Sequence, residues 1–298
     1  QHFIMVSIIK KLRREQGYYY LEHSFRIDGR IEKKQLYLGK NIPKEIEQIK
    51  SKFILSIYKE KWFKKFDKIK TNFSKEQKLI PGSIKEKEIN TFGIKFTYDS
   101  NRIEGSTLTL KETADLLERG ITPKKSFNDI KEAEAHKKLF DEILNYNKNL
   151  SLDAILYWHK KLFQETKPDI AGRIRKHQVM ISRSKFIPQL TAKLDFLLKE
   201  FLDWYDKNKS KLNPIELAAL VHLKFVTIHP FWDGNGRISR LMMNFVLNKY
   251  KCPMINIHYE NRNSYYNSLE RSQIKRNNNI FLHWFFRRYL KENNRYLG

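Results

Sequence analysis

The chain has 298 residues, with 58 Lys and Arg against 33 Asp and Glu, a formal net charge of +25 and one cysteine, Cys252. This length accommodates one or two domains, and a hydrophobic fraction of 41 % excludes an intrinsically disordered chain. One cysteine excludes an internal disulfide and a thiolate metal cluster, and no stretch reaches the roughly 18 apolar residues that are typical of a membrane span.

A cytoplasmic location is the simplest expectation, because unpaired thiols are typical of reducing compartments. The N-terminus turns basic after a short apolar run, the reverse of a signal peptide. We expect Met5 to be the natural start, with residues 1–4 left from cloning. The positive charge favours anionic ligands such as nucleotides, nucleic acid or acidic protein surfaces, although a composition rich in Lys, Ile, Asn, Phe and Tyr explains it equally well.

Residues 1–42 are predicted to form a small antiparallel β-sheet domain. Strand-forming residues fill 3–14, 18–27 and 30–39, and the Asp28-Gly29 pair is typical of a hairpin turn. About three strands are therefore expected.

Beyond Pro43 the pattern indicates helices. Apolar residues three and four apart predict a long helix from Glu45 to Phe66, and we interpret 43–83 as this connecting helix and a linker. Residues 84–298 then form a mainly α-helical domain. Its helices are predicted at about 84–102, 109–119, 127–147, 151–164, 189–207, 213–227, 234–249, 262–275 and 279–293.

Helix ends and one interruption are also visible. Gly105 and Gly120 stand where C-terminal caps belong, and Asn213 followed by Pro214 is typical of a helix start. Residues 172–188 interrupt the helices, and their second part, 178–188, is predicted to form a short β-hairpin.

The most informative run is His229 to Arg240, HPFWDGNGRISR. A helix delivers His229 into a loop that Pro230 keeps from continuing as helix. Asp233 is a candidate N-cap of the next helix, and residues 234–236 are small enough for backbone N–H groups to close on an anion.

These residue types suit phosphoryl chemistry. Arg237 and Arg240 are three apart, so they share one helix face near the N-terminus, and guanidinium groups match phosphate oxygens. His229 is a candidate to take a proton from an attacking hydroxyl, and Asp233 a candidate to hold Mg²⁺ between phosphate oxygens. Charge on a leaving pyrophosphate would be stabilised by Arg237 and the helix start.

The run resembles the signature of the Fic family in every defined position. The resemblance implies a Fic-type helical bundle with a short β-hairpin flap, here preceded by the N-terminal sheet. It also implies a protein adenylyltransferase, which moves AMP from ATP onto a Tyr, Ser or Thr hydroxyl of a target protein. His229 would be the general base, and Asp233 the Mg²⁺ ligand. The nucleotide phosphates would contact Gly234, Asn235, Gly236, Arg237 and Arg240, the last at the γ-phosphate.

A second run, SNRIEG from Ser100 to Gly105, resembles the inhibitory motif of Fic proteins whose inhibitory helix precedes the core. On a helix, Ser100 and Glu104 lie one turn apart on the same face. The resemblance implies that Glu104 pairs with Arg240 and so displaces the γ-phosphate. We therefore expect an autoinhibited resting state.

Two further sites follow from the resemblance. The predicted hairpin is similar to the flap on which Fic enzymes dock a target chain by strand addition, through Gln178, Val179, Met180 and Ile181. The region after the motif helix is similar to the one that encloses adenine, with Tyr265, Tyr266 and Gln273 as its candidate contacts.

Several interpretations stay open. The same fold supports removal of AMP from a modified target, or transfer of another phosphate-bearing group. A different class, a nucleic-acid-binding regulator, is favoured by basic and aromatic residues in 3–40. The expected partners are ATP and a target protein, with self-modification, nucleic acid and a homodimer as additional candidates.

Overall fold

The computed structural model describes residues 6–27, 30–182 and 184–298. It divides into two compact units, Gln1–Lys65 and Phe66–Gly298. The division falls inside the helix that the sequence predicts as a connector over 43–83.

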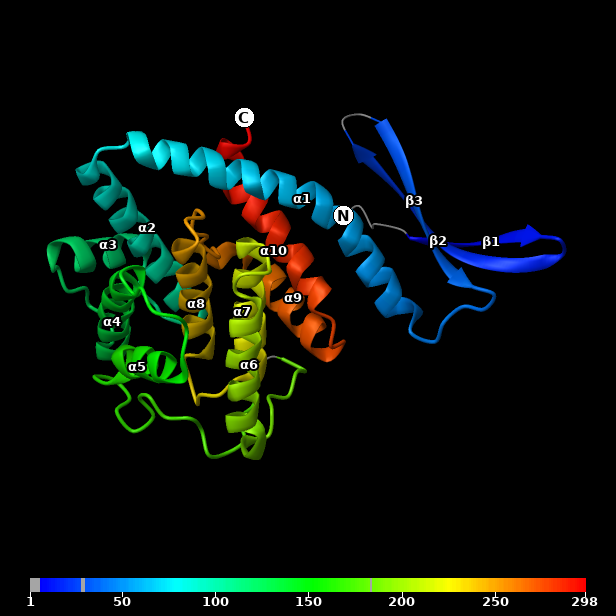
Figure 1. Cartoon of the computed structure of the whole chain (residues 1–298). Helices are drawn as coiled ribbons and strands as arrows, with labels where there is room; N and C mark the ends of the chain where they lie inside the picture. The colour runs from blue at the N-terminus through cyan, green and yellow to red at the C-terminus, as the bar shows by residue number, and fades with distance from the viewer. Residues whose placement is uncertain (1–5, 28–29, 183) are drawn as a thin grey trace. The chain divides into compact units, whose positions relative to one another are not determined.

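The first unit contains a three-stranded antiparallel sheet in the order β1-β2-β3 (Figure 1). Its strands are β1 (Ser7–Arg13), β2 (Gln16–Ile27) and β3 (Arg30–Gly39). The predicted sheet is confirmed, while the expected Asp28-Gly29 turn lies outside the described residues. One face of the sheet packs on the start of α1 (Ile46–Leu79), where Leu21 meets Phe53 and Ile57 in a small apolar core.

Helix α1 is longer than predicted. The apolar pattern indicated an end at Phe66, but the helix continues to Leu79. Residues 67–79 are mostly good helix formers, and the helix stops just before Pro81, whose ring disfavours helical backbone in the preceding residue. Because α2 (Gly82–Ile103) begins at once, there is no extended linker among these residues.

The second unit is a bundle of helices, as the sequence predicts. Its remaining helices are α3 (Leu110–Arg119), α4 (Phe127–Leu144), α5 (Leu152–Phe163), α6 (Leu194–Asn208), α7 (Pro214–Ile228), α8 (Asn235–Lys249), α9 (Arg262–Ile274) and α10 (Asn278–Glu292). Two bounds differ from the prediction by several residues: α4 ends earlier, and α6 begins after a short 3₁₀ turn at Thr191–Lys193. The predicted caps at Asn213 and Gly120 are present.

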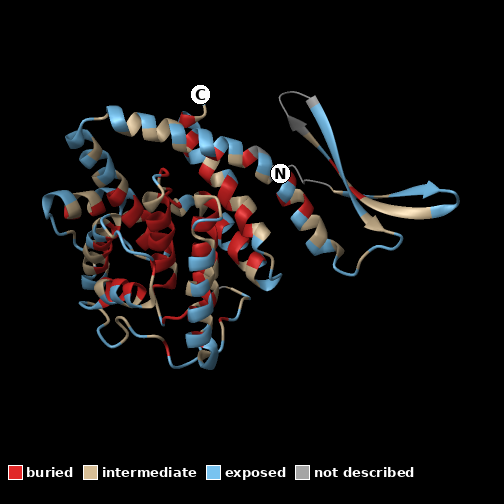
Figure 2. Ribbon diagram, viewed as in Figure 1, coloured by how far each residue is buried: buried red, intermediate tan, exposed pale blue. Residues whose placement is uncertain are grey.

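Helices α7 and α8 pack against each other at the centre of this unit. Figure 2 shows how completely α8 is buried, and nearly all of α7 is buried too. The other helices surround this pair, which fixes the position of the 229–234 loop between them. Among the described helices, none is both long and apolar enough to cross a membrane.

The segment 172–190 differs from the predicted hairpin. Its described residues, all but Arg183, form no strand. Its two arms are still held together, because Gln178 Nε2 donates to the Pro188 carbonyl at 2.9 Å and Ser184 N donates to the Ile181 carbonyl at 3.1 Å. The segment is therefore a hairpin-shaped loop without a β-ladder. The hydrogen bond that joins its arms comes from the Gln178 side chain, and a pattern of alternating residues does not predict such a bond.

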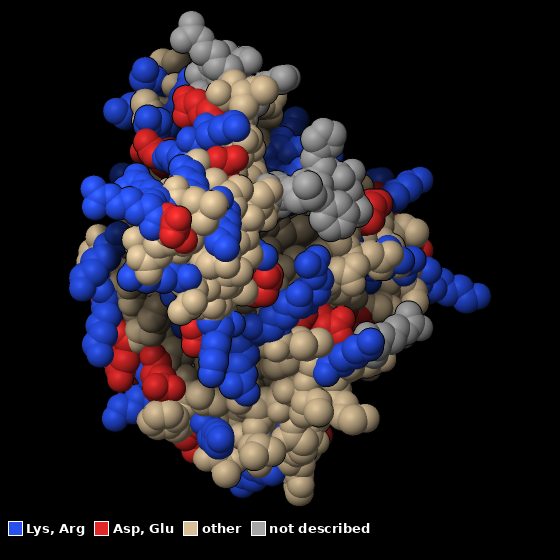
Figure 3. All heavy atoms as spheres, turned by 90° about the vertical axis from the view of Figure 1, so that its right-hand side faces the viewer, with Lys and Arg blue, Asp and Glu red and all other residues tan. Residues whose placement is uncertain are grey.

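The surface is strongly basic. Figure 3 shows Lys and Arg spread widely over one side, with fewer Asp and Glu between them, in line with the net charge of +25.

Candidate active site

The loop between α7 and α8 has a fixed backbone. His229 ends α7 in the left-handed region, with φ 55°. The Asn235 amide bonds both ways to Phe231, accepting from its N–H at 2.9 Å and donating to its carbonyl at 2.8 Å. Gly234 has φ 79°, and a Cβ there would lie 2.4 Å from the Phe163 ring. Only glycine fits that position.

The expected N-cap at Asp233 is wrong. Helix α8 begins at Asn235 with Gly234 as its N-cap, and among the described residues no side chain caps its first N–H groups. The Asp233 carboxylate instead accepts from the N–H of Gly234 at 2.5 Å, and this N–H lies before the first residue of the helix. The first N–H groups of α8 are therefore left for an anion, since a helix N-terminus carries a partial positive charge.

His229 is held ready to accept a proton. Its Nδ1 lies 3.3 Å from the Val226 carbonyl, which places the ring proton on Nδ1 and leaves a lone pair on Nε2. Burial lowers the pKa of His229 to about 4, so the imidazole is neutral at pH 7. Arg175 anchors the same turn, donating from Nε to the His229 carbonyl at 2.8 Å.

Arg240 is held by the C-terminal end of α2. Its guanidinium lies 2.6 Å from Glu104 Oε1 and 2.9 Å from Ser100 Oγ. The Arg240 side chain is 1 % exposed and that of Glu104 28 %. Burial disfavours the charged guanidinium, but the Glu104 carboxylate outweighs it and raises the pKa of Arg240. The predicted pair between Glu104 and Arg240 is thus present.

The same carboxylate lies at the start of α8. A Cβ placed on Gly236 would be 2.2 Å from Glu104 Oε1 and 3.0 Å from Arg240 Nη1. The missing side chain of Gly236 therefore makes the room that Glu104 fills. A negative charge near the first turn of a helix is favourable, because the helix N-terminus carries a partial positive charge.

Arg237 points to a different set of partners. It pairs with Glu132, and its Nη1 donates to Asn101 Oδ1 at 3.2 Å. Its guanidinium also lies 4.7 Å from the centre of the Phe163 ring. Although burial disfavours its charged form, Glu132 and Asp233 raise the pKa of Arg237.

Asp233 is ionised and paired with Lys167. The Lys167 ammonium lies 2.7 Å from Asp233 Oδ2 and 2.9 Å from Glu132 Oε1. Burial works to raise the pKa of Asp233, but Arg237 and Lys167 together lower it to about 2. Mg²⁺ in nucleotide sites is commonly held by one or two carboxylates together with phosphate oxygens, so the ionised, partly exposed Asp233 fits this ion once Lys167 moves.

Sequence reasoning missed three contributors to this site. Glu132 and Lys167 lie about 100 and 70 residues before Arg237 and Asp233, in segments without any motif. Arg175 is almost fully buried and donates to three carbonyls, those of His177, Gln189 and His229. No spacing rule connects these residues to the motif, because their role depends on the tertiary packing.

The candidate adenine contacts separate into two groups. Tyr265 is buried, and its hydroxyl lies 2.9 Å from His222 Nε2 and 3.5 Å from Arg240 Nη1. The Tyr266 hydroxyl donates to the Ile103 carbonyl at 2.9 Å while its ring stays partly exposed. Tyr265 is thus positioned to support Arg240, and Tyr266 to tie α9 to the end of α2.

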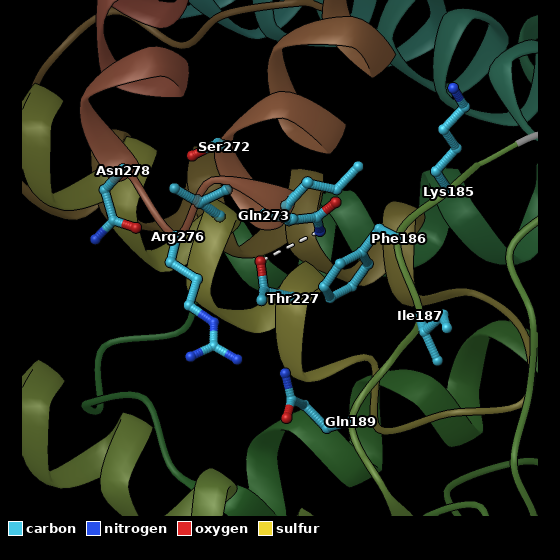
Figure 4. Close-up of a pocket in the computed structure, with 11 residues that line it drawn as sticks. Lys185, Phe186, Ile187, Gln189, Thr227, Ser272, Gln273, Arg276 and Asn278 are labelled. Carbon is cyan, nitrogen blue, oxygen red and sulfur yellow. Dashed lines mark hydrogen bonds between the residues drawn. The ribbon is translucent and has the colours of Figure 1, made fainter. Parts of the chain in front are cut away.

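Gln273 lines a cavity of about 600 Å³ between the 172–190 loop and the ends of α7 and α9. In Figure 4, Phe186 and Gln189 reach this cavity from the loop, and Gln273 bonds to Thr227 Oγ1 at 3.2 Å. Neither Tyr265 nor Tyr266 lines it. Among the predicted flap residues, Met180 is exposed while Val179 and Ile181 are half-buried.

Comparison with known proteins agrees with this geometry. Residues 149–247 match the family model described as Fic/DOC family. A protein named protein adenylyltransferase Fic from Nematostella vectensis is 34 % identical over 213 residues, covering 69 % of this chain and 49 % of the relative. Protein adenylyltransferase fic-1 of Caenorhabditis elegans is 36 % identical over 181 residues, covering 58 % of this chain and 35 % of the relative.

Solved structures show the same fold. A Fic domain-containing signaling protein from Bacteroides thetaiotaomicron superimposes with a TM-score of 0.70 at 27 % identity, covering 78 % of this chain and 96 % of that one. A Fic-1 structure from C. elegans, residues 134–508, gives 0.70 at 27 % identity, covering 82 % and 73 %. The chain spans about half or less of the length of the two curated relatives. Because residues 149–247 match the Fic/DOC family model and these solved structures share the fold, the chain carries a domain of the Fic/DOC family.

Proposed function

We propose that this protein is an adenylyltransferase that moves AMP from ATP to a Tyr, Ser or Thr hydroxyl of a target protein. The proposal is supported by the names of its relatives and by one observation above all. Glu104 lies against Gly236 and Arg240 at the uncapped start of α8, and its charge also acts on His229 and Arg237.

In this proposal the triphosphate of ATP replaces the Glu104 carboxylate on α8. Arg240 binds the γ-phosphate, while Arg237 and the N–H groups after Gly234 bind the α- and β-phosphates. Since the Asn235 side chain is already bonded to Phe231, its contact with phosphate is made by the backbone. Asp233 holds Mg²⁺, which when bound neutralises phosphate charge.

The transfer step needs only one proton acceptor. Nε2 of His229 takes the proton of the target hydroxyl, whose oxygen forms a bond to the α-phosphorus. The bond between the α-phosphorus and the bridging oxygen breaks, and its electron pair leaves with pyrophosphate. Because the pKa of His229 is lowered, the base is unprotonated before the reaction begins.

In this proposal Glu104 is the inhibitory residue. With its carboxylate on Arg240, the γ-phosphate lacks its partner and the α-phosphate is misaligned for attack. A misplacement of about 1 Å costs on the order of 100-fold in rate. The resting enzyme is therefore autoinhibited.

The remaining assignments extend the same proposal. Adenine enters the cavity that Gln273 lines, and a target chain docks along Gln178–Ile181. Self-modification and a homodimer belong to the proposal as well. A cytoplasmic location would supply ATP and Mg²⁺.

Mass spectrometry for AMP adducts tests the function. Wild type, His229→Ala and Glu104→Gly are incubated with ATP and Mg²⁺, alone and with candidate targets. We expect adducts with Glu104→Gly, few with wild type and none with His229→Ala. AMP removal from a pre-modified protein without any forward labelling would favour the hydrolase, and adducts from another phosphate-bearing donor would favour the broader transferase.

A further inference from the structure

The sheet of the first unit has one closed face and one open face. Side chains alternate between the faces along each strand. The closed face carries Leu21, which is fully buried against α1. We use the term open face for the opposite side, whose cationic and aromatic residues are Lys11, Arg13, Tyr18, Tyr20, Lys33 and Tyr37.

The open face has more exposed apolar surface than a structural role requires. Tyr37 is 52 % exposed, and Ile31, further along the same strand and face, is 67 % exposed. Exposed tyrosines are enriched at interaction surfaces, because one end of the side chain is apolar and the other polar. The apolar core of this unit uses the other face, so the tyrosines on the open face are not needed to hold the sheet on α1.

The tyrosines form one platform. Tyr37 lies in the middle, with ring centres 5.2 Å from Tyr20 and 6.2 Å from Tyr18. The register explains this grouping, because Tyr20 pairs directly with Tyr37. The Lys11 ammonium lies 4.9 Å from the centre of the Tyr20 ring. Rings and cations in contact on one surface offer both stacking and ion pairing to a ligand.

The charge of this unit favours an anionic ligand. Residues 1–65 contain 16 Lys and Arg against 7 Asp and Glu, a net charge of +9. Glu22 is the acidic group of β2 on the open face. It is paired with Lys33 at 3.8 Å and accepts from Gln35 Nε2 at 2.5 Å, so its charge is largely offset. Lys11 and Arg13 are exposed on the same face.

We propose that the open face binds single-stranded nucleic acid. Unpaired bases stack on exposed aromatic rings, and the neighbouring cations bind the phosphates between them. In a duplex the base faces are hidden, so the tyrosines would remain unused. An acidic protein surface would satisfy the lysines but not the three adjacent rings. The role goes beyond AMP transfer and does not depend on it.

Binding of fluorescent oligonucleotides to the full chain tests this surface without ATP. The probes are single-stranded DNA, single-stranded RNA and duplex DNA of about 20 nucleotides, longer than the roughly 4–16 nucleotides that one OB-fold domain covers. We expect a preference for a single strand, and the two single-stranded probes show whether DNA or RNA is the ligand. Tyr37→Ala should weaken binding by about 5- to 150-fold, the factor that corresponds to 1–3 kcal/mol per stacked base.

Charge variants give an independent result. Replacing Lys11 and Arg13 together by Ala should lower the slope of log Kd against log salt by about 1.4, since each phosphate contact to a single strand contributes roughly 0.7. Lys199→Ala with Lys207→Ala removes the same charge from the exposed side of α6 and should leave the slope unchanged. Tyr37→Leu keeps apolar bulk without a ring and replaces Tyr37→Ala if that variant unfolds.

Three outcomes would overturn the proposal. In the first, duplex and single strands bind equally and the tyrosine variants bind as well as wild type. In the second, the α6 control variant lowers the salt slope as much as the charge variant of the open face. In the third, polyglutamate displaces the oligonucleotide at the same concentration of charge. The absence of any nucleic-acid binding at low salt would also overturn it. None of these outcomes bears on AMP transfer, which is read from adducts.

Discussion

Removing Glu104 should convert the resting enzyme into an active one. The carboxylate contacts Arg240 at 2.6 Å and fills the space above Gly236. In Glu104→Gly both the charge and the side chain disappear, so Arg240 and the start of α8 become available to phosphate. Arg240 keeps its bonds to Ser100, at 2.9 Å to both Oγ and the carbonyl, and so stays in place.

The size of the effect follows from the pair that is lost. A hydrogen bond between charged groups contributes about 1.5–3 kcal/mol when one side is buried. ATP must displace this contact before its γ-phosphate reaches Arg240. Each 1.4 kcal/mol is a factor of ten in an equilibrium constant, so Glu104→Gly should raise the rate of AMP transfer by roughly 10- to 150-fold.

The assay is the initial rate of labelling with radioactive ATP at saturating Mg²⁺. Glu104→Gln keeps the shape but loses the charge, and should give an intermediate rate. Glu142→Gln, on the exposed surface of α4, is the matched control and should behave as wild type. Equal rates for wild type and Glu104→Gly, with both proteins folded, would refute the inhibitory role of this pair.

Three further predictions concern the same site. Gly236→Ala puts a methyl group 2.2 Å from the place of Glu104 Oε1; calorimetry should show weakened ATP binding, and a gain in AMP transfer would contradict a phosphate seat at this position. In the Glu104→Gly background, Lys167→Met removes the ammonium 2.7 Å from Asp233 and should lower the Mg²⁺ concentration for half-maximal labelling severalfold, whereas an increase would show that Lys167 supports the metal. Because the pKa of His229 is lowered to about 4, the base stays neutral as the pH falls past 6.5, so kcat should decline only near pH 4–5; an inflection near 6.5 would indicate a solvated imidazole or a different base.

Local patterns predicted the helices well, because amphipathic spacing and caps are properties of short segments. Each helix of the second unit was found from its apolar period. The exception was α1, whose end is set by Pro81 rather than by the last apolar residue of its first half. The motif around His229 also carried enough information to place the central loop.

Long-range partners could not be predicted. Glu132 and Lys167 acquire their meaning only when α4 and the turn after α5 are brought against Asp233 and Arg237. The Glu104 pair was an exception, since a second motif identified it. For the loop at 178–188, no local pattern indicates that a glutamine side chain replaces strand pairing.

A structure of Glu104→Gly with a non-hydrolysable ATP analogue tests the central claim most directly. The γ-phosphate should lie within hydrogen-bond distance of Arg240, the β-phosphate on the first N–H groups of α8, and the α-phosphate facing Nε2 of His229. A nucleotide bound elsewhere, with Arg240 and His229 turned away from its phosphates, would contradict the account.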